Sequence, residues 1–314
     1  MDNEGERSFR GLSRSSQWIH GIFLRFAAGG LIPARWFLSD LPGVEERSAK
    51  RGRLKVEVVS HCWNYSHLLA YQLSSLIQQP PANVDVVMTV FFCEEDEKTL
   101  ALLTFFGAME VRGVTWNWRA LPRQKLFRRG IGRNLAARET QADWVWFTDC
   151  DLMFREGCLD ALGEILQGRR DALVFPREER CTSLLADSDP MLQAGGVGPR
   201  IVDISTEHFT VRPRTRATGP LQITHGDVAR AAGYCESLRL YQQPSETWCK
   251  AYEDRAFRWL LRTQGTPIDL PGVYRIRHIA KGRYTGAAAS TGTRSGIRRL
   301  KSWLNELGWG RRGA

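Results

Sequence analysis

The feature that most constrains the fold is a regular alternation of strand-like and helix-like segments between residues 54 and 166. Short runs of β-branched and aromatic residues predict strands at residues 54–60, 84–92, 111–118 and 144–148. Longer amphipathic stretches predict helices at about residues 66–79, 95–106, 128–140 and 158–166. This βαβαβαβα order predicts an α/β fold with a doubly wound, mostly parallel sheet. Beyond residue 175 the pattern loosens, and regularity returns near residues 227–232, 253–263 and 273–278.

Charge and apolar residues set the two ends of the chain apart from its centre. Residues 1–55 hold ten Lys and Arg against six Asp and Glu, and residues 275–314 hold ten against one, so the stretch between them carries −3 of the net charge of +10. Each end also has aromatic and aliphatic residues beside the basic ones, around residues 18–38 and 297–307. We therefore expect an N-terminal amphipathic and basic extension (1–53), a catalytic domain (54–284) and a basic C-terminal tail with a helix (285–314).

Targeting and redox signals favour a cytoplasmic protein, at the inner face of the membrane if the terminal segments bind lipid. The seven cysteines are scattered without a CxxC pair, and no uninterrupted apolar run approaches about 18 residues. The apolar end segments fit two alternatives: a helix lying in the membrane interface, or a face packed on the domain. Both alternatives stay open at this point.

The sharpest chemical motif is the apolar run of residues 144–148, which ends in Asp149, Cys150 and Asp151. In extended backbone, residues i and i+2 point to the same side, so both carboxylates can address one cation. Mg²⁺ and Mn²⁺ prefer oxygen ligands and usually complete their shell with water and substrate phosphates. The motif alone also fits a helix cap followed by a solvated turn.

Other polar residues gain weight from their order along the chain. Glu253 and Asp254 open an amphipathic helix, whose N-terminus favours an ionised carboxylate and so suits a general base. His278 closes a strand-like run and is a plausible further ligand for Mn²⁺. Arg133 lies on the predicted helix before the paired aspartates, where it could pair with an acidic or phosphate group. No GxxxxGK[ST] or GxGxxG motif is present, which disfavours the common P-loop and Rossmann sites.

Taken in order, these elements over about residues 55–280 resemble the family 2 type of GT-A glycosyltransferase. The C-terminal half is similar to the galactosyltransferase-like segment of chondroitin-type polymerases and β-galactosyltransferases. The resemblance implies a GT-A (nucleotide-diphospho-sugar transferase) fold. It also implies a donor-binding set that consists of Ser60, His61, Trp63, Glu94, Arg133, Asn134, Asp149, Gly219, Gln222 and Trp248.

The same resemblance implies the reaction. Asp149, Asp151 and His278 would bind Mn²⁺ or Mg²⁺, Asp254 would be the base, and Glu253 would orient substrate. The chain departs from the family pattern on the acceptor side, because Lys250, Ala251 and Tyr252 replace a Gly-rich approach to the acidic pair. The second departure is Ala232 before Gly233, where a Gly pair is common.

The expected function is inverting, metal-dependent transfer of a sugar from a nucleotide-diphosphate sugar, with a UDP-sugar favoured, to an acceptor hydroxyl. We expect a carbohydrate or lipid-linked acceptor in surface polysaccharide or glycolipid synthesis. Two alternatives remain: a glycosyltransferase that acts on modified DNA bases, because the C-terminal segment is basic, and a metal-dependent nucleotidyltransferase, which also places paired carboxylates at a strand end. A non-catalytic protein that docks on membrane or nucleic acid is disfavoured by the complete acidic set.

Overall fold

The computed structural model describes residues 19, 21–24, 26, 27, 29, 32–246 and 252–279. Within these residues the chain forms a seven-stranded sheet in the order β10-β6-β9-β4-β1-β2-β3 and a four-stranded sheet in the order β5-β11-β7-β8. The strands of the large sheet are β1 (Leu54–His61), β2 (Val84–Phe92), β3 (Val114–Ala120), β4 (Trp144–Phe147), β6 (Leu173–Pro176), β9 (Gln222–His225) and β10 (Thr266–Ile268). Those of the small sheet are β5 (Leu152–Phe154), β7 (Glu178–Cys181), β8 (Thr210–Pro213) and β11 (Val273–Arg275).

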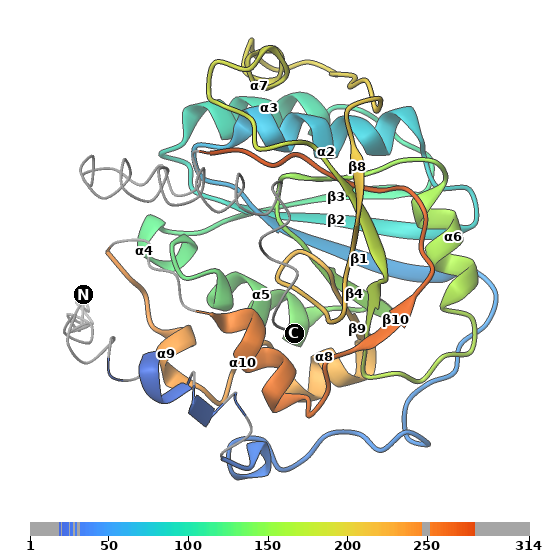
Figure 1. The fold of residues 1–314 in the computed structure, drawn as a ribbon, viewed down its shortest axis with the longest axis vertical. Coiled ribbons are helices and arrows are strands. Elements are labelled where there is room, and N and C mark those ends of the chain that lie inside the picture. Colours follow the sequence, from blue (N-terminus) through green and yellow to red (C-terminus); the bar gives the residue numbers. More distant parts are fainter. Residues whose placement is uncertain are drawn as a thin grey trace, which may run out of the picture.

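Helices lie on both faces of the large sheet (Figure 1). The helical elements are η2 (Ala34–Trp36), α2 (Ser66–Gln78), α3 (Glu97–Gly107), α4 (Arg123–Leu126), α5 (Arg129–Glu139), α6 (Cys158–Ile165), α7 (Pro190–Gly195), α8 (Gly226–Ala232), α9 (Arg239–Gln242) and α10 (Glu253–Leu260). Helices α2, α3 and α6 belong to one hydrophobic cluster, and α5, α8 and α10 belong to the other. The predicted α/β class with a mostly parallel, doubly wound sheet is confirmed.

Strand β4 shows why its sequence is apolar at every position. Trp144 and Trp146 pack into the cluster on one face of the sheet, whereas Val145 and Phe147 pack into the cluster on the other. All four residues are therefore buried, as expected for a central strand of a sheet that is covered on both faces. The strand ends where the chain becomes polar, at Thr148.

The strand order reverses beside the end of β4. From β1 the chain moves outward through β2 to β3, and it then returns to the other side of β1 as β4. In open α/β sheets, ligands bind where the strand order reverses in this way, beyond the carboxyl ends of the strands. Residues that follow β1 and β4 therefore lie where the topology favours a ligand. The antiparallel strand β9 then joins β4 to β6.

The N-terminal segment is partly packed on the domain. Leu24 and Ala27 are buried in the same cluster as α10, and the ring of Phe37 lies 5.2 Å from that of Trp259. Ile19, Phe23, Phe26 and Trp36 remain exposed. Docking of one face is thus observed, while contact of the exposed face with a membrane stays a prediction, as does the division into three segments. No described helix is long and apolar enough to cross a membrane, and the predicted C-terminal tail (285–314) lies outside the described residues.

Candidate functional site

The turn between β4 and β5 carries the paired aspartates at the switch point of the sheet. Asp149 follows β4 by two residues, and its side chain is 22% exposed. Asp151 directly precedes β5 and is buried, and its carbonyl accepts a hydrogen bond from the Ile276 amide beyond β11. The turn therefore links the two sheets, with one carboxylate partly open and the other enclosed.

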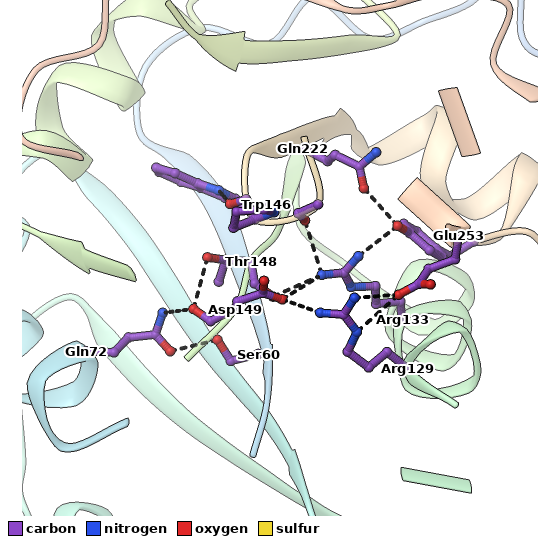
Figure 2. Close-up of polar contacts among 12 residues, drawn as sticks. Ser60, Gln72, Arg129, Arg133, Trp146, Thr148, Asp149, Gln222 and Glu253 are labelled. Atoms are coloured by element: carbon purple, nitrogen blue, oxygen red, sulfur yellow. Dashed lines mark hydrogen bonds and ion pairs between the residues drawn. The ribbon is translucent and has the colours of Figure 1, made fainter. Parts of the chain in front are cut away.

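Two arginines from α5 converge on Asp149 (Figure 2). Arg129 and Arg133 lie one turn apart, on the same side of the helix. The Nη1 atom of Arg129 donates to Asp149 Oδ1 at 2.6 Å, and the Nη2 atom of Arg133 lies 3.4 Å from the same oxygen. Arg133 is fully buried. Because a buried charge is costly without hydrogen-bond partners, its guanidinium needs further acceptors.

These acceptors come from the end of β4, the segment before β9 and the turn after α8. Arg133 donates from Nη2 to the carbonyls of Thr148 and Gly219, at 3.1 Å each, and from Nη1 to the Tyr234 hydroxyl at 2.8 Å. The Tyr234 hydroxyl in turn donates to Gln222 Oε1 at 2.8 Å. The predicted residues Arg133, Gly219 and Gln222 are thereby brought together around one buried guanidinium.

The acidic pair at the start of α10 is connected to the same network. Glu253 is buried, and its Oε1 atom accepts from Arg129 Nε at 3.0 Å and Nη2 at 2.7 Å. Burial raises the pKa of Glu253, but the Arg129 and Arg133 guanidiniums outweigh this effect and hold the pKa of that carboxyl below its usual range. The side chain of Asp254 is 32% exposed and lies 3.5 Å from Arg258, while Gln222 holds its carbonyl at 3.1 Å. Asp254 is therefore the more accessible carboxylate of the pair.

The backbone before the acidic pair explains one departure from the family pattern. Tyr252 adopts a left-handed conformation with φ of 53°, which a glycine adopts at less cost. A Gly-rich approach at this point would relieve that strain, and this chain instead places an aromatic side chain there. Lys250, Ala251 and the predicted donor-binding residue Trp248 lie outside the described residues.

The end of β1 lies beside the first turn of α5. The His61 ring stacks on Phe91 at 5.1 Å, and a side chain at Gly132 would collide with its Nε2 atom, so α5 approaches β1 closely here. Burial lowers the pKa of His61 well below its usual value, and the nearby Arg133 and Arg129 lower it further. The imidazole is therefore neutral near pH 7. Ser60 is fully buried and donates to Gln72 Oε1 at 2.6 Å, so it links the end of β1 to α2.

The remaining predicted donor contacts differ in their surroundings. Trp63 is buried in the core and meets the ring of Phe127 edge to face, with 5.5 Å between the centroids. Asn134 accepts from the Tyr234 amide at 2.8 Å and so holds the turn after α8. Glu94 is exposed after β2. Nucleotide contacts by these three residues stay predictions.

The residues predicted to bind a metal do not form a preassembled three-residue site. Among the described residues, no three His, Cys, Asp or Glu side chains lie together as a metal site would require. His278 is buried beyond β11, where its ring meets that of Tyr65 at 5.3 Å. Two carboxylates from one turn, Asp149 and Asp151, still fit a hard cation that takes its other ligands from water and phosphate. Binding of Mn²⁺ or Mg²⁺ by these three residues stays a prediction.

Two residues of the network, Arg129 and Gln72, were not predicted from the sequence. Arg129 was detectable as the residue four positions before Arg133, on the same side of a helix. Gln72 is fully buried in α2 and donates to the Asp149 carbonyl at 3.1 Å. Its only sequence signal is a polar residue among the leucines of an apolar helix, and that pattern does not identify its partner.

Comparison with known proteins gives distant structural similarity alone. No protein-family model matches the sequence, and no curated protein matches it. The mannosyltransferase PcManGT from Pyrobaculum calidifontis, solved with GDP-Man and Mn²⁺, is 16% identical; the match covers 95% of this chain and 77% of that chain, with a TM-score of 0.41. Residues 1–349 of S. aureus TarS solved with UDP are 16% identical over 71% of this chain and 60% of that one, with a TM-score of 0.44. Solved structures similar to this chain thus include proteins that hold a nucleotide sugar or a nucleotide.

Proposed function

We propose that this protein is an inverting glycosyltransferase of the GT-A family 2 type, which transfers a sugar from a nucleotide-diphosphate donor to an acceptor hydroxyl. The observation that carries the proposal is the ion-pair network at the switch point. It joins Asp149 at the end of β4, Arg129 and Arg133 on α5, and Glu253 at the start of α10. Basic groups for a diphosphate and carboxylates for a cation and a base therefore meet in one network.

The chain's own residues divide the work by their position. Arg129 and Arg133 present guanidiniums that suit phosphate oxygens, because their forked donors match phosphate geometry. Asp149 and Asp151 would hold a divalent cation, which when bound supplies charge neutralisation for the diphosphate leaving group. Asp254, the accessible member of its pair, would take the proton of the acceptor hydroxyl. Glu253 holds Arg129 and so orients the donor side relative to Asp254.

A panel of nucleotide sugars tests the proposal directly. The protein is incubated with each donor, with and without Mn²⁺, and the products are separated by ion-exchange chromatography. We expect metal-dependent release of a nucleoside diphosphate from at least one donor, with a UDP-sugar favoured. Pyrophosphate as the product would instead identify nucleotidyl transfer, and no turnover of any donor would contradict both enzymatic functions.

Two variants and an acceptor screen follow with the best donor. Asp151→Ala should remove most of the Mn²⁺ dependence of donor binding, whereas Asp85→Ala, at an exposed ion pair with Arg53, should leave it unchanged. Equal metal dependence in wild type and Asp151→Ala would remove Asp151 from the site. Lipid-linked saccharides, free polysaccharide and DNA with hydroxylated bases are then offered as acceptors. We expect transfer to one of the first two, and transfer to DNA alone would support the alternative acceptor class.

A further inference from the structure

The side chain of Arg129 bridges two acidic groups, Asp149 after β4 and Glu253 at the start of α10. Its Nη1 atom lies 2.6 Å from Asp149 Oδ1, and its Nη2 atom lies 2.7 Å from Glu253 Oε1. The Arg129 side chain is 29% exposed, compared with 22% for the Asp149 side chain and 7% for that of Glu253. It is therefore an accessible cation between a partly open carboxylate and an enclosed one.

This bridge conflicts with a metal ion on Asp149. A divalent cation coordinated by Asp149 would compete with Arg129 for the same carboxylate, and it would repel the positive guanidinium at short range. Arg133 also lies 3.4 Å from Asp149 Oδ1, so the carboxylate already faces two positive groups. Metal binding in the absence of an anion therefore breaks the ion pair between Arg129 and Asp149 and leaves two guanidiniums close to the ion.

An anion beside Arg129 removes that electrostatic cost. The contacts from Nε and Nη2 to Glu253 can persist while Nη1 leaves Asp149 and meets a phosphate oxygen. The His61 ring, whose pKa is lowered chiefly by burial and further by the neighbouring arginines, adds no competing charge on the β1 side. A diphosphate would thus provide a new partner for the Arg129 guanidinium when a divalent cation replaces it on the Asp149 carboxylate.

We propose that Arg129 is a placeholder cation that couples metal binding to donor binding. This inference rests on the proposed function. Without donor, the Arg129 guanidinium would neutralise Asp149 in place of a metal ion. Only metal and diphosphate together would displace it. The coupling would suppress binding of free metal ions and would make the donor complex depend on both components. Typical couplings between two sites change affinity by about 5–150-fold.

Binding of Mn²⁺ to the full chain tests the coupling without any measurement of turnover. The electron paramagnetic resonance signal of free Mn²⁺ is titrated with wild type, Arg129→Gln and Arg129→Lys, each alone and with saturating UDP or GDP, after correction for the complex that Mn²⁺ forms with the nucleotide in solution. Arg123→Gln is the matched control, because Arg123 forms an exposed ion pair with Glu95. Circular dichroism establishes that each variant is folded.

For Arg129→Gln we expect tighter Mn²⁺ binding without nucleotide, by about tenfold, and a smaller gain when nucleotide is added. Arg129→Lys keeps a charge but loses the fork, so its values should lie between those of wild type and Arg129→Gln. A merely structural role for Arg129 cannot produce a gain of metal affinity. Equal Mn²⁺ affinity of wild type and Arg129→Gln without nucleotide would overturn the coupling while leaving the proposed function intact. No Mn²⁺ binding by any form, with either nucleotide, would overturn both.

Discussion

Replacing Arg133 with methionine tests whether its buried guanidinium holds the site together. Arg133 is fully buried and donates to the carbonyls of Thr148 and Gly219 and to the Tyr234 hydroxyl. These partners belong to the end of β4, the segment before β9 and the turn after α8. Methionine keeps much of the apolar stem but has no donor, so the two carbonyls lose a charged partner. Thr148 is buried and Gly219 is half-buried.

The expected cost follows from these contacts. A hydrogen bond that involves a charged group is worth about 1.5–3 kcal/mol, so two carbonyls give about 3–6 kcal/mol, while removal of a desolvated guanidinium returns part of this. We expect Arg133→Met to lower the free energy of unfolding by about 3–5 kcal/mol, in the range measured when one partner of a buried ion pair is removed. Urea denaturation followed by tryptophan fluorescence measures this difference.

The control is Arg119→Met, which removes a more exposed ion pair with Glu139 at 2.6 Å. Surface pairs contribute about 0–1 kcal/mol, so this variant should stay close to wild type. A loss below about 1 kcal/mol for Arg133→Met would refute the reasoning, because the two carbonyls would then have found other partners at little cost.

Three further predictions concern the base, the turn and pH. Asp254→Asn should lower sugar transfer by about 10²–10⁴-fold and leave Mn²⁺-dependent donor binding nearly unchanged, and equal initial rates for variant and wild type would rule out this base. Gln72→Leu removes the hydrogen bond to the Asp149 carbonyl, so it should lower the free energy of unfolding by about 1–3 kcal/mol and weaken nucleotide-sugar binding. Urea denaturation and calorimetry measure the two effects, and unchanged values in both would exclude a role in holding the turn. Burial lowers the pKa of His225 below 6.5, and its ring accepts from the Asp227 amide and contacts the Ser48 carbonyl, so the neutral form is stabilised. Its contribution should be complete above pH 6.5 and decline as pH falls below 6.5, so urea midpoints at pH 8 and 5.5 should differ less in His225→Gln than in wild type, and an equal difference would contradict the assignment.

The sequence predicts the parallel half of the fold well because its elements are long and strongly patterned. The strand at residues 84–92 has the predicted bounds, and the strand predicted from residue 111 begins at Val114. Its first residues form a turn instead, since Gly113 has φ of +76° and packs against the Pro81 carbonyl. The helix predicted from residue 95 begins at Glu97, because the Asp96 side chain caps it by accepting from the Thr99 amide.

The second half was less predictable for physical reasons. Strands β6 to β10 contain three or four residues each, which is too short for a periodic pattern to separate a strand from an irregular segment. The site shows the same limit: the carboxylate pair and the acidic helix start are local patterns, and the sequence indicates both. The bridge by Arg129 joins residues 124 positions apart, so no local pattern reports it.

The antiparallel strand β9 has a consequence for how the chain is made. One edge of β4 pairs with β1, which precedes it in the sequence. Its other edge pairs with β9 (residues 222–225), with Trp144 opposite His225, and cannot pair until β9 has been synthesised. During synthesis the parallel half can assemble while this apolar edge stays open, which exposes the nascent chain to aggregation and to chaperones. Most of the large sheet also emerges from the ribosome before the partners of the two arginines. These partners are Gly219 and Tyr234 for Arg133, and Glu253 for Arg129. We therefore expect this charge network to form only after most of the large sheet has emerged, so a chain truncated before Glu253 would not display a working arrangement of charges.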